Sequence, residues 1–338
     1  MKVVVYGPEQ RVGVLRARGV VDANAAFAKY AQEATGEAAP YVLAAAMAPP
    51  RLREFIDAGS RAIQSTGEAL AYLDERAQDD LGPRGERVVV SLDEVKLHPP
   101  LATRANRIVN LGGNFADHMR DYRLHRLNEQ VTIEQVRADV RLQGIWGFYK
   151  IAECAIGHDD ELVYPRHTTQ LDYEGEIAMV FGRRAKDQRP EDLAKHVWGY
   201  TLQNDWSLRD QPENPLSGYA LAKNFDGSSA LGPCIVVDEI GDPQGIPFET
   251  RVNGELRQCG NTRDMIFSFG EAFEHLTRCF TIQPGDILSA GTNAGTAVDL
   301  PGPNGPGAPD PSLFAKPGDV VEIHSPEIGT LRNRVVAS

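Results

Sequence analysis

The stretch that decides the fold is Leu171 to Val180, which reads Leu-Asp-Tyr-Glu-Gly-Glu-Ile-Ala-Met-Val. Its apolar second half predicts a buried strand, and side chains on a strand alternate between its two faces. Glu174 and Glu176 therefore project from the same face, with Cα atoms about 6.6 Å apart. Two carboxylates this close repel each other unless a cation or hydrogen-bond donors lie between them. The stretch thus predicts a site for a hard divalent metal ion.

The composition limits the classes of partner. The chain has 338 residues, 42% of them hydrophobic and 24% charged, which suits one large domain or two unequal ones. A formal net charge of -12 argues against nucleic acid or an anionic membrane surface as the main partner, because both require clustered lysine and arginine. No stretch approaches the roughly eighteen apolar residues of a membrane span, and the N-terminus lacks a signal-peptide pattern. We therefore expect a cytoplasmic protein.

The first hundred residues have a pattern of their own. Residues 2–22 alternate as in a short β unit, and residues 24–76 place apolar side chains at the three- and four-residue spacing of helices. Glycine and proline at 82–83 interrupt this pattern. We predict a small N-terminal α/β domain over residues 1–100 and a catalytic domain over residues 101–338.

A candidate general base follows the apolar run at residues 108–111. The run ends in two glycines, and His118 and Asp121 then stand three residues apart, which makes them neighbours on a helical turn. This spacing would let a carboxylate orient an imidazole for proton transfer. The alternative is an exposed histidine at the start of a solvated helix. The charged segment that follows, residues 122–143, is either a surface helix or a lid, and Thr132 to Gln135 has capping-box spacing.

Three positions further along could complete a site. Asp205 ends a second predicted strand, residues 197–205, where it would supply a third oxygen ligand or only begin a turn. Lys223 lies in a predicted loop and is either catalytic or simply solvated. Small residues at 289–295 permit close approach of a ligand to the backbone, which makes Thr292 a candidate donor, although a tight turn explains the glycines equally well. Asn253-Gly254 predicts a type I′ hairpin.

Several short blocks occur in a fixed order between residues 107 and 336. They are Asn-Phe-Ala-Asp-His at 114–118, Asp-Tyr-Glu-Gly-Glu at 172–176, Gly-Tyr-Thr-Leu-Gln-Asn-Asp-Trp-Ser-Leu-Arg-Asp at 199–210, Lys-Asn-Phe-Asp at 223–226, Pro-Gly-Asp-Ile-Leu-Ser-Ala-Gly-Thr at 284–292, Lys-Pro-Gly-Asp-Val-Val-Glu-Ile at 316–323 and Gly-Thr-Leu-Arg-Asn at 329–333. In series, these blocks resemble the fumarylacetoacetate hydrolase family.

The resemblance implies a fold, an assembly and a set of site residues. The implied fold is α+β and mainly β, with a mixed β-roll as the catalytic domain behind the smaller N-terminal domain, and the implied assembly is a homodimer. The cofactor implied is Mg²⁺, or Mn²⁺ or Ca²⁺ in its place. The roles implied are metal ligation by Glu174, Glu176 and Asp205, catalysis by His118, Asp121 and Lys223, and substrate binding by Thr292, Gln203 and Arg209. Asp121 stands where smaller members of the family have a glutamate, which is longer by one methylene.

The reaction predicted on this basis is hydrolysis of a carbon–carbon bond in a β-diketone or an acylpyruvate-type 2-oxo acid. His118 would activate the water, and the metal would stabilise the departing enolate. The same enolate chemistry supports a second possibility, which is decarboxylation, tautomerisation or hydration of a 2-oxo acid. A third possibility, from another class, is a family member that binds a ligand without catalysis.

Overall fold

The computed structural model describes residues 1–76, 80–211, 218–303 and 305–338. Its strands are short, and most of them belong to two sheets. In chain order they are β1 (Lys2–Tyr6), β2 (Arg11–Arg16), β3 (Gly19–Asp22), β4 (Val89–Val90), β5 (Leu97–His98), β6 (Ile108–Leu111), β7 (Gly147–Lys150), β8 (Ala155–Ile156), β9 (Glu161–Val163), β10 (Leu171–Asp172), β11 (Gly175–Phe181), β12 (Val197–Asp205), β13 (Ser207–Leu208), β14 (Ser229–Val236), β15 (Pro247–Val252), β16 (Glu255–Asn261), β17 (Ile287–Ser289), β18 (Pro301–Gly302), β19 (Gly305–Pro309), β20 (Val320–Ser325) and β21 (Gly329–Val336).

The larger sheet of the described chain has twelve strands. Its main path runs β4-β3-β2-β1-β14-β12-β11-β17-β6-β7, with β5 beside β1 and β8 beside β14. The second sheet has the order β16-β15-β20-β21-β9, and β10–β13 and β18–β19 form two small pairs. Most neighbours are antiparallel, but β17 pairs with β6 in parallel. The result is the mixed, mainly β fold that the sequence predicts.

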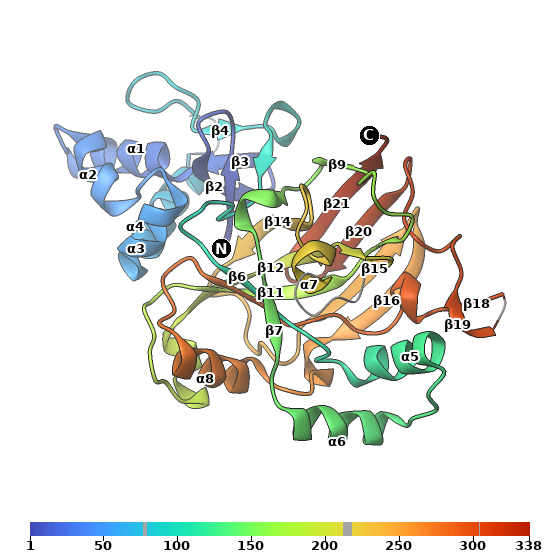
Figure 1. Ribbon diagram of the computed structural model, residues 1–338. Coiled ribbons are helices and arrows are strands. Elements are labelled where there is room, and N and C mark those ends of the chain that lie inside the picture. Colours follow the sequence, from blue (N-terminus) through green and yellow to red (C-terminus); the bar gives the residue numbers. More distant parts are fainter. Residues whose placement is uncertain (77–79, 212–217, 304) are drawn as a thin grey trace.

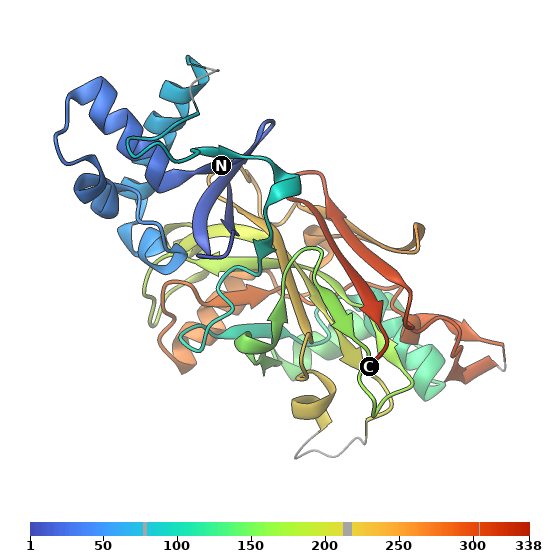
Figure 2. The same cartoon turned by 90° about the horizontal axis from the view of Figure 1, so that it is seen from above.

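The described chain has eight α-helices outside the sheets. They are α1 (Ala23–Thr35), α2 (Pro40–Met47), α3 (Leu52–Ala58), α4 (Ser60–Asp74), α5 (Ala116–Leu127), α6 (Ile133–Gln143), α7 (Gly218–Ala222) and α8 (Phe269–Cys279). Helices α1 to α4 lie together next to β2 and β3, whereas α5 and α6 lie beside each other on the far side of the strands (Figure 1). The view from above shows the same separation (Figure 2). No helix in the described ranges is long and apolar enough to cross a membrane.

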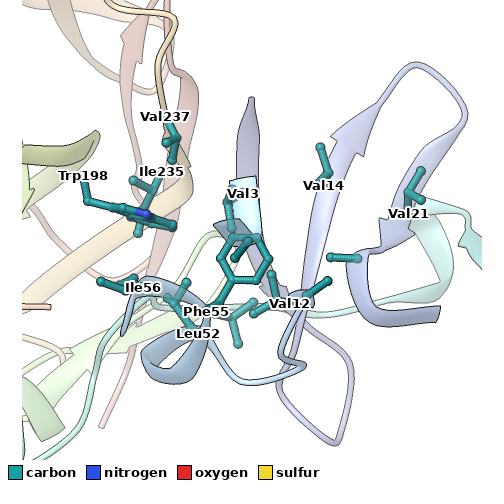
Figure 3. Packing of buried hydrophobic residues seen from close by; sticks show 14 of the residues in the cluster. Val3, Val12, Val14, Val21, Leu52, Phe55, Ile56, Trp198, Ile235 and Val237 are labelled. Atoms are coloured by element: carbon teal, nitrogen blue, oxygen red, sulfur yellow. The ribbon is translucent and has the colours of Figure 1, made fainter. Parts of the chain in front are cut away.

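The N-terminal region is joined to the rest of the chain through both the sheet and the core. Strand β1 pairs with β14, so that Val3 lies opposite Ile235. Phe55 of α3 is fully buried and meets the Trp198 ring edge-on, with the two ring centroids 6.3 Å apart. Figure 3 shows these side chains together in one apolar cluster. The predicted α/β character of residues 1–100 is confirmed, while the boundary near residue 100 stays a prediction.

The strand predicted over residues 171–180 is divided in the structure. It consists of β10 and β11, and the two residues between them leave the ladder because side chains take their backbone hydrogen bonds. Tyr173 N donates to Asp172 Oδ1 at 2.9 Å, and Glu174 N donates to Asn204 Oδ1 at 2.9 Å. The break lets β10 pair with β13 while β11 pairs with β12.

Two local predictions are confirmed. Asn253 and Gly254 connect β15 to β16 with φ angles of 52° and 82°, the left-handed conformation that a type I′ turn requires. Thr132 caps α6 through a capping box with Gln135.

Replacement of Phe55 by alanine should lower the free energy of unfolding by about 3–5 kcal/mol, because it removes a fully buried ring between α3 and β12. Urea denaturation of the full chain would measure the loss. Val42→Ala is the control, since that side chain is 76% exposed and its truncation should change the stability by less than about 0.5 kcal/mol. A loss below about 1 kcal/mol for Phe55→Ala would contradict the proposed docking of α3.

Candidate functional site

The pairing of β11 with β12 brings three carboxylates together. Glu176 lies opposite Gln203 in the register, and Asp205 N donates to Glu174 O at 2.9 Å. One carboxylate oxygen from each of Glu174, Glu176 and Asp205 lies within 4.8 Å of the other two, and all three side chains are buried. The residues predicted as metal ligands therefore form one cluster.

Glu176 is the least neutralised member of this cluster. Its Oε2 accepts hydrogen bonds from Ser289 of β17 and from Asn110 of β6, the latter at 3.3 Å. Its Oε1 has no hydrogen-bond partner among the described residues. Burial, together with the charges of Asp205 and Glu174, raises the pKa of Glu176 well above its ordinary value. A cation at this carboxylate would favour its ionised form.

Glu174 has two cationic partners. Its Oε2 accepts a hydrogen bond from Lys223 Nζ at 2.6 Å, and its Oε1 accepts one from Arg209. Burial opposes ionisation, but these two cations outweigh it and hold the pKa of Glu174 well below its usual range. Lys223 also donates to Asp205 Oδ2 at 2.9 Å, and the two carboxylates raise its pKa despite the cost of burial. Lys223 therefore bridges two of the predicted metal ligands.

Lys150 is a third cation at the cluster, and sequence reasoning missed it. Its Nζ donates to Asp205 Oδ1 at 2.5 Å and to Ser228 O at 2.9 Å. Burial lowers the pKa of Lys150, because little water is left to solvate its charge. The only sequence signal is its place at the end of the apolar β7, which predicts an edge strand as readily as a site.

The donor set fits a hard divalent cation. Three buried carboxylates whose oxygen atoms lie close together are ligands of the kind that Mg²⁺ prefers. The three residues of this group are all carboxylates, so it contains neither a thiol nor an imidazole. Burial and the negative charges of Asp205 and Glu174 raise the pKa of Glu176, which shows that the protein itself compensates the charge of the cluster only in part. Glu174, Glu176 and Asp205 would hold the ion.

His118 approaches the cluster from α5. The start of this helix is fixed by Asn114, whose side chain accepts a hydrogen bond from Phe267 N at 2.8 Å and donates one to Ala290 O at 2.9 Å. His118 is nearly buried, and its Nδ1 lies 2.8 Å from Asp299 Oδ2. Its Nε2 has no partner in the described part of the chain.

The structure corrects the expected partner of His118. Asp121 accepts a hydrogen bond from Arg120 at 2.7 Å and does not contact the imidazole. Asp299 takes that place from a 3₁₀ turn at Ala297–Asp299, which packs against α5. Burial lowers the pKa of His118, but the charge of Asp299 and the hydrogen bond to it raise the pKa more, so that the net shift is upward. Thr296 and Asp299 form a capping box, and their spacing is the only sequence signal for this turn.

Asp172 connects the two halves of the site. This fully buried carboxylate accepts hydrogen bonds from Ala297 N at 2.7 Å and Val298 N at 3.2 Å, at the start of the turn that carries Asp299. It also accepts one from Arg209 Nε at 2.9 Å. Because Arg209 also binds Glu174, the metal-ligand cluster and the turn beside His118 share one set of contacts.

A cavity of about 430 Å³ opens above the carboxylates. Seven of the nine predicted site residues line it, namely His118, Glu174, Glu176, Asp205, Arg209, Lys223 and Thr292. Its apolar wall contains Met119 and Tyr122 of α5 together with Trp146 and Phe148 of the β7 region. Helix α5 thus forms part of the cavity wall, and the lid over residues 122–143 stays a prediction.

Two predicted substrate-binding residues have other contacts. Gln203 is fully buried outside the cavity lining, and its Nε2 donates to Ser229 Oγ at 2.8 Å. This placement corrects its predicted substrate contact. Thr292 lines the cavity, but its hydroxyl donates to Gly175 O at 2.9 Å and accepts from Gln258 Nε2 at 2.7 Å. Its proton is therefore directed to the backbone of β11.

Comparison with known proteins identifies related sequences. Residues 107–336 match the C-terminal domain of fumarylacetoacetate hydrolase. The oxaloacetate tautomerase YisK of Bacillus subtilis is 34% identical over 290 residues, which are 85% of this chain and 87% of that protein.

Solved structures with a similar fold include enzymes with different reactions. The fumarylacetoacetate hydrolase of Exiguobacterium antarcticum is 26% identical, with a TM-score of 0.67 and full coverage of both chains. The 2-hydroxyhepta-2,4-diene-1,7-dioate isomerase of Mycobacterium marinum is 28% identical, with a TM-score of 0.57, and the match covers 74% of this chain and 81% of that one.

Replacement of Glu176 by glutamine should weaken Mg²⁺ binding by at least about a hundredfold, because the amide removes an anionic oxygen from the cluster while keeping its shape. Isothermal calorimetry with Mg²⁺ would measure the change. Glu161→Gln is the matched control, since that side chain is exposed on β9 and its loss should leave the affinity unchanged. Equal affinity in the two variants would exclude Glu176 as a ligand.

Proposed function

Because the chain belongs to the fumarylacetoacetate hydrolase family, we propose that it interconverts the keto and enol forms of a small 2-oxo acid such as oxaloacetate. The sequence-based preference for carbon–carbon bond hydrolysis gives way to its alternative, tautomerisation. The name of the Bacillus subtilis relative supports this choice, as does the isomerase among the similar structures. The homodimer and the cytoplasmic location stay predictions.

The observation that carries this proposal is that most donor hydrogens beside the carboxylates already have acceptors, namely the single hydroxyl proton of Thr292 and two of the three N–H groups of Lys223. Hydrolysis requires a donor for the tetrahedral oxyanion, and Lys223 and Thr292 line the cavity beside the carboxylates. Lys223 Nζ already donates to two carboxylates and lies 5.0 Å from the centroid of the Phe148 ring. Thr292 donates to Gly175 O. Enolisation requires only that a proton move between carbon and oxygen, which one imidazole can perform.

His118 is the proposed base. Donation of Nδ1–H to Asp299 leaves Nε2 as the acceptor, and Nε2 would take a proton from the carbon next to the keto group. The C–H electron pair then forms the carbon–carbon double bond, and the carbonyl π pair moves onto oxygen. The imidazolium, stabilised by Asp299, returns its proton to that oxygen to give the enol. No water is consumed, and no bond between carbon atoms breaks.

The remaining residues hold the substrate and the ion. A divalent cation on Glu174, Glu176 and Asp205 would offset the negative charge that develops on the substrate oxygen. Arg209 and Lys223 keep Glu174 ionised through their ion pairs, so that this ligand is ready at neutral pH. The apolar wall of the cavity limits access of water to the enolate.

A substrate panel tests the reaction. With Mg²⁺ in D₂O, the enzyme should accelerate exchange of the C3 protons of oxaloacetate, as followed by NMR, and EDTA should abolish the effect. An acylpyruvate in the same panel should show no accelerated cleavage. Rapid cleavage of the acylpyruvate without accelerated exchange on oxaloacetate would restore the hydrolase, and release of pyruvate at the rate of exchange would indicate a decarboxylase.

Asp299→Asn should shift the acidic limb of the pH–rate profile to lower pH and reduce the maximal rate by at least about tenfold. The protonated imidazole loses the charge that raises its pKa, so the free base persists to lower pH, while the ring loses its anionic partner. The profile of kcat/KM for oxaloacetate would show both effects. Asp121→Asn is the control and should leave the limb in place, because Asp121 binds Arg120. The reverse pattern would return Asp121 to the site.

A further inference from the structure

The cavity contains four basic side chains, and their partners differ. Three of them already face carboxylates: His118 faces Asp299, Arg209 faces Asp172 and Glu174, and Lys223 faces Glu174 and Asp205. The fourth is Arg126, near the C-terminal end of α5. Within the described ranges, no carboxylate lies within ion-pair distance of its guanidinium. Arg126 is therefore the basic side chain of the cavity that has no carboxylate partner in the described part of the chain.

The other arginines of α5 emphasise this difference. Arg120 pairs with Asp121, and Arg123 pairs with Asp139 of α6 at 2.8 Å. Arg126 instead donates from Nη2 to the backbone oxygen of Arg209 at 2.8 Å. This bond places the head group beside the residue that holds Glu174, and its remaining N–H groups stay available.

The surroundings of Arg126 favour an anionic ligand. Tyr122, Leu127, Leu208 and Val298 line the same cavity and offer no charge. A half-buried guanidinium in such a wall gains from an ion pair more than it would in open water, because the local dielectric constant is lower. Its planar N–H groups match a carboxylate, to which they can donate two parallel hydrogen bonds.

The position of Arg126 on α5 determines how far its side chain lies from the proposed base, His118. His118 and Arg126 are eight residues apart on α5, which is a rise of about 12 Å. Helical side chains lean toward the N-terminus of their helix, and arginine is long enough to cover much of this distance. A ligand of four or so carbon atoms can therefore meet the imidazole and the guanidinium together.

We propose that Arg126 binds the distal carboxylate of a dicarboxylic 2-oxo acid and so determines the specificity of this site. The inference rests on the proposed function and deepens it. Glu174, Glu176 and Asp205 would hold the cation that offsets the charge of the first carboxylate, and the second carboxylate neutralises Arg126. A monocarboxylate of the same length leaves the guanidinium without an anion, and the site should discriminate against it.

The test compares oxaloacetate with 2-oxobutanoate, which has a methyl group in place of the distal carboxylate. The measured quantity is the ratio of kcat/KM values for C3 proton exchange, with Mg²⁺ present. In Arg126→Met this ratio should fall by about 30-fold, mainly through KM for oxaloacetate, the size expected for loss of a charge-assisted hydrogen-bond pair. In Arg126→Lys the ratio should fall less than in Arg126→Met, because lysine keeps the positive charge but lacks the planar guanidinium that can donate two parallel hydrogen bonds. Arg120→Met, on the same helix outside the cavity, should leave the ratio within about twofold.

Two further measurements distinguish a failure of the proposed role of Arg126 from a failure of the proposed function. Calorimetric Mg²⁺ affinity equal to that of the wild type shows that a variant has folded with an intact cluster. An unchanged ratio in a folded Arg126→Met variant overturns the role of Arg126. If the wild type exchanges protons of neither acid, the proposed function fails, and the dissociation constants of the two acids, measured by calorimetry with Mg²⁺, still decide the role of Arg126. Equal weakening of both acids by Arg126→Met would also overturn it.

Discussion

Glu174, Glu176 and Asp205 lie buried within a few ångströms of one another, so their negative charges require positive charge nearby. This requirement determines which side chains surround the cluster. Lys150, Arg209 and Lys223 provide the positive charge, from β7, from the residue after β13 and from the segment between α7 and β14. Ion pairs of this kind are costly to desolvate, so they rarely add stability compared with an apolar core. Their value lies in keeping Glu174 and Asp205 close together until a metal ion and a substrate bind.

The twelve-stranded sheet brings these charged and polar side chains together. Strands β6, β11, β12, β14 and β17 follow one another in space in an order that the chain does not follow, and each contributes a polar group near one region. Glu176 on β11 receives hydrogen bonds from Asn110 on β6 and from Ser289 on β17, although these residues are far from it in sequence. Backbone pairing fixes the distances between these groups more firmly than loops would.

The predictable part of the site consists of residues whose chemistry follows from local spacing. Glu174 and Glu176 share a face by strand alternation, and Asp205 ends a strand, so the metal cluster could be expected before its geometry was known. The partner of His118 could not, because Asp299 is 181 residues away and reaches it only through a turn held by Asp172. Sequence proximity favoured Asp121, although its side chain binds its neighbour instead.

The same limit applies to the fold. Short periodic segments predicted the β character of residues 2–22 and the hairpin at Asn253, because both depend on local backbone preferences. The division of the strand at residues 173–174 involves Asp172 and Asn204, whose side-chain oxygens accept hydrogen bonds from the backbone N–H groups of Tyr173 and Glu174. No local pattern indicates the hydrogen bond to Asn204, because that residue lies 30 positions from Glu174.

Helix α5 links the chemistry to substrate choice. One end of it carries the proposed base, His118, and the other carries Arg126, so that a single rigid element positions both groups relative to the carboxylates. The start of the helix is tied to Phe267 and Ala290 through Asn114, and its end is tied to Arg209 through Arg126. Displacement of either end would move base and recognition group together. A substrate that bridges them would therefore stabilise the helix orientation in which proton transfer takes place.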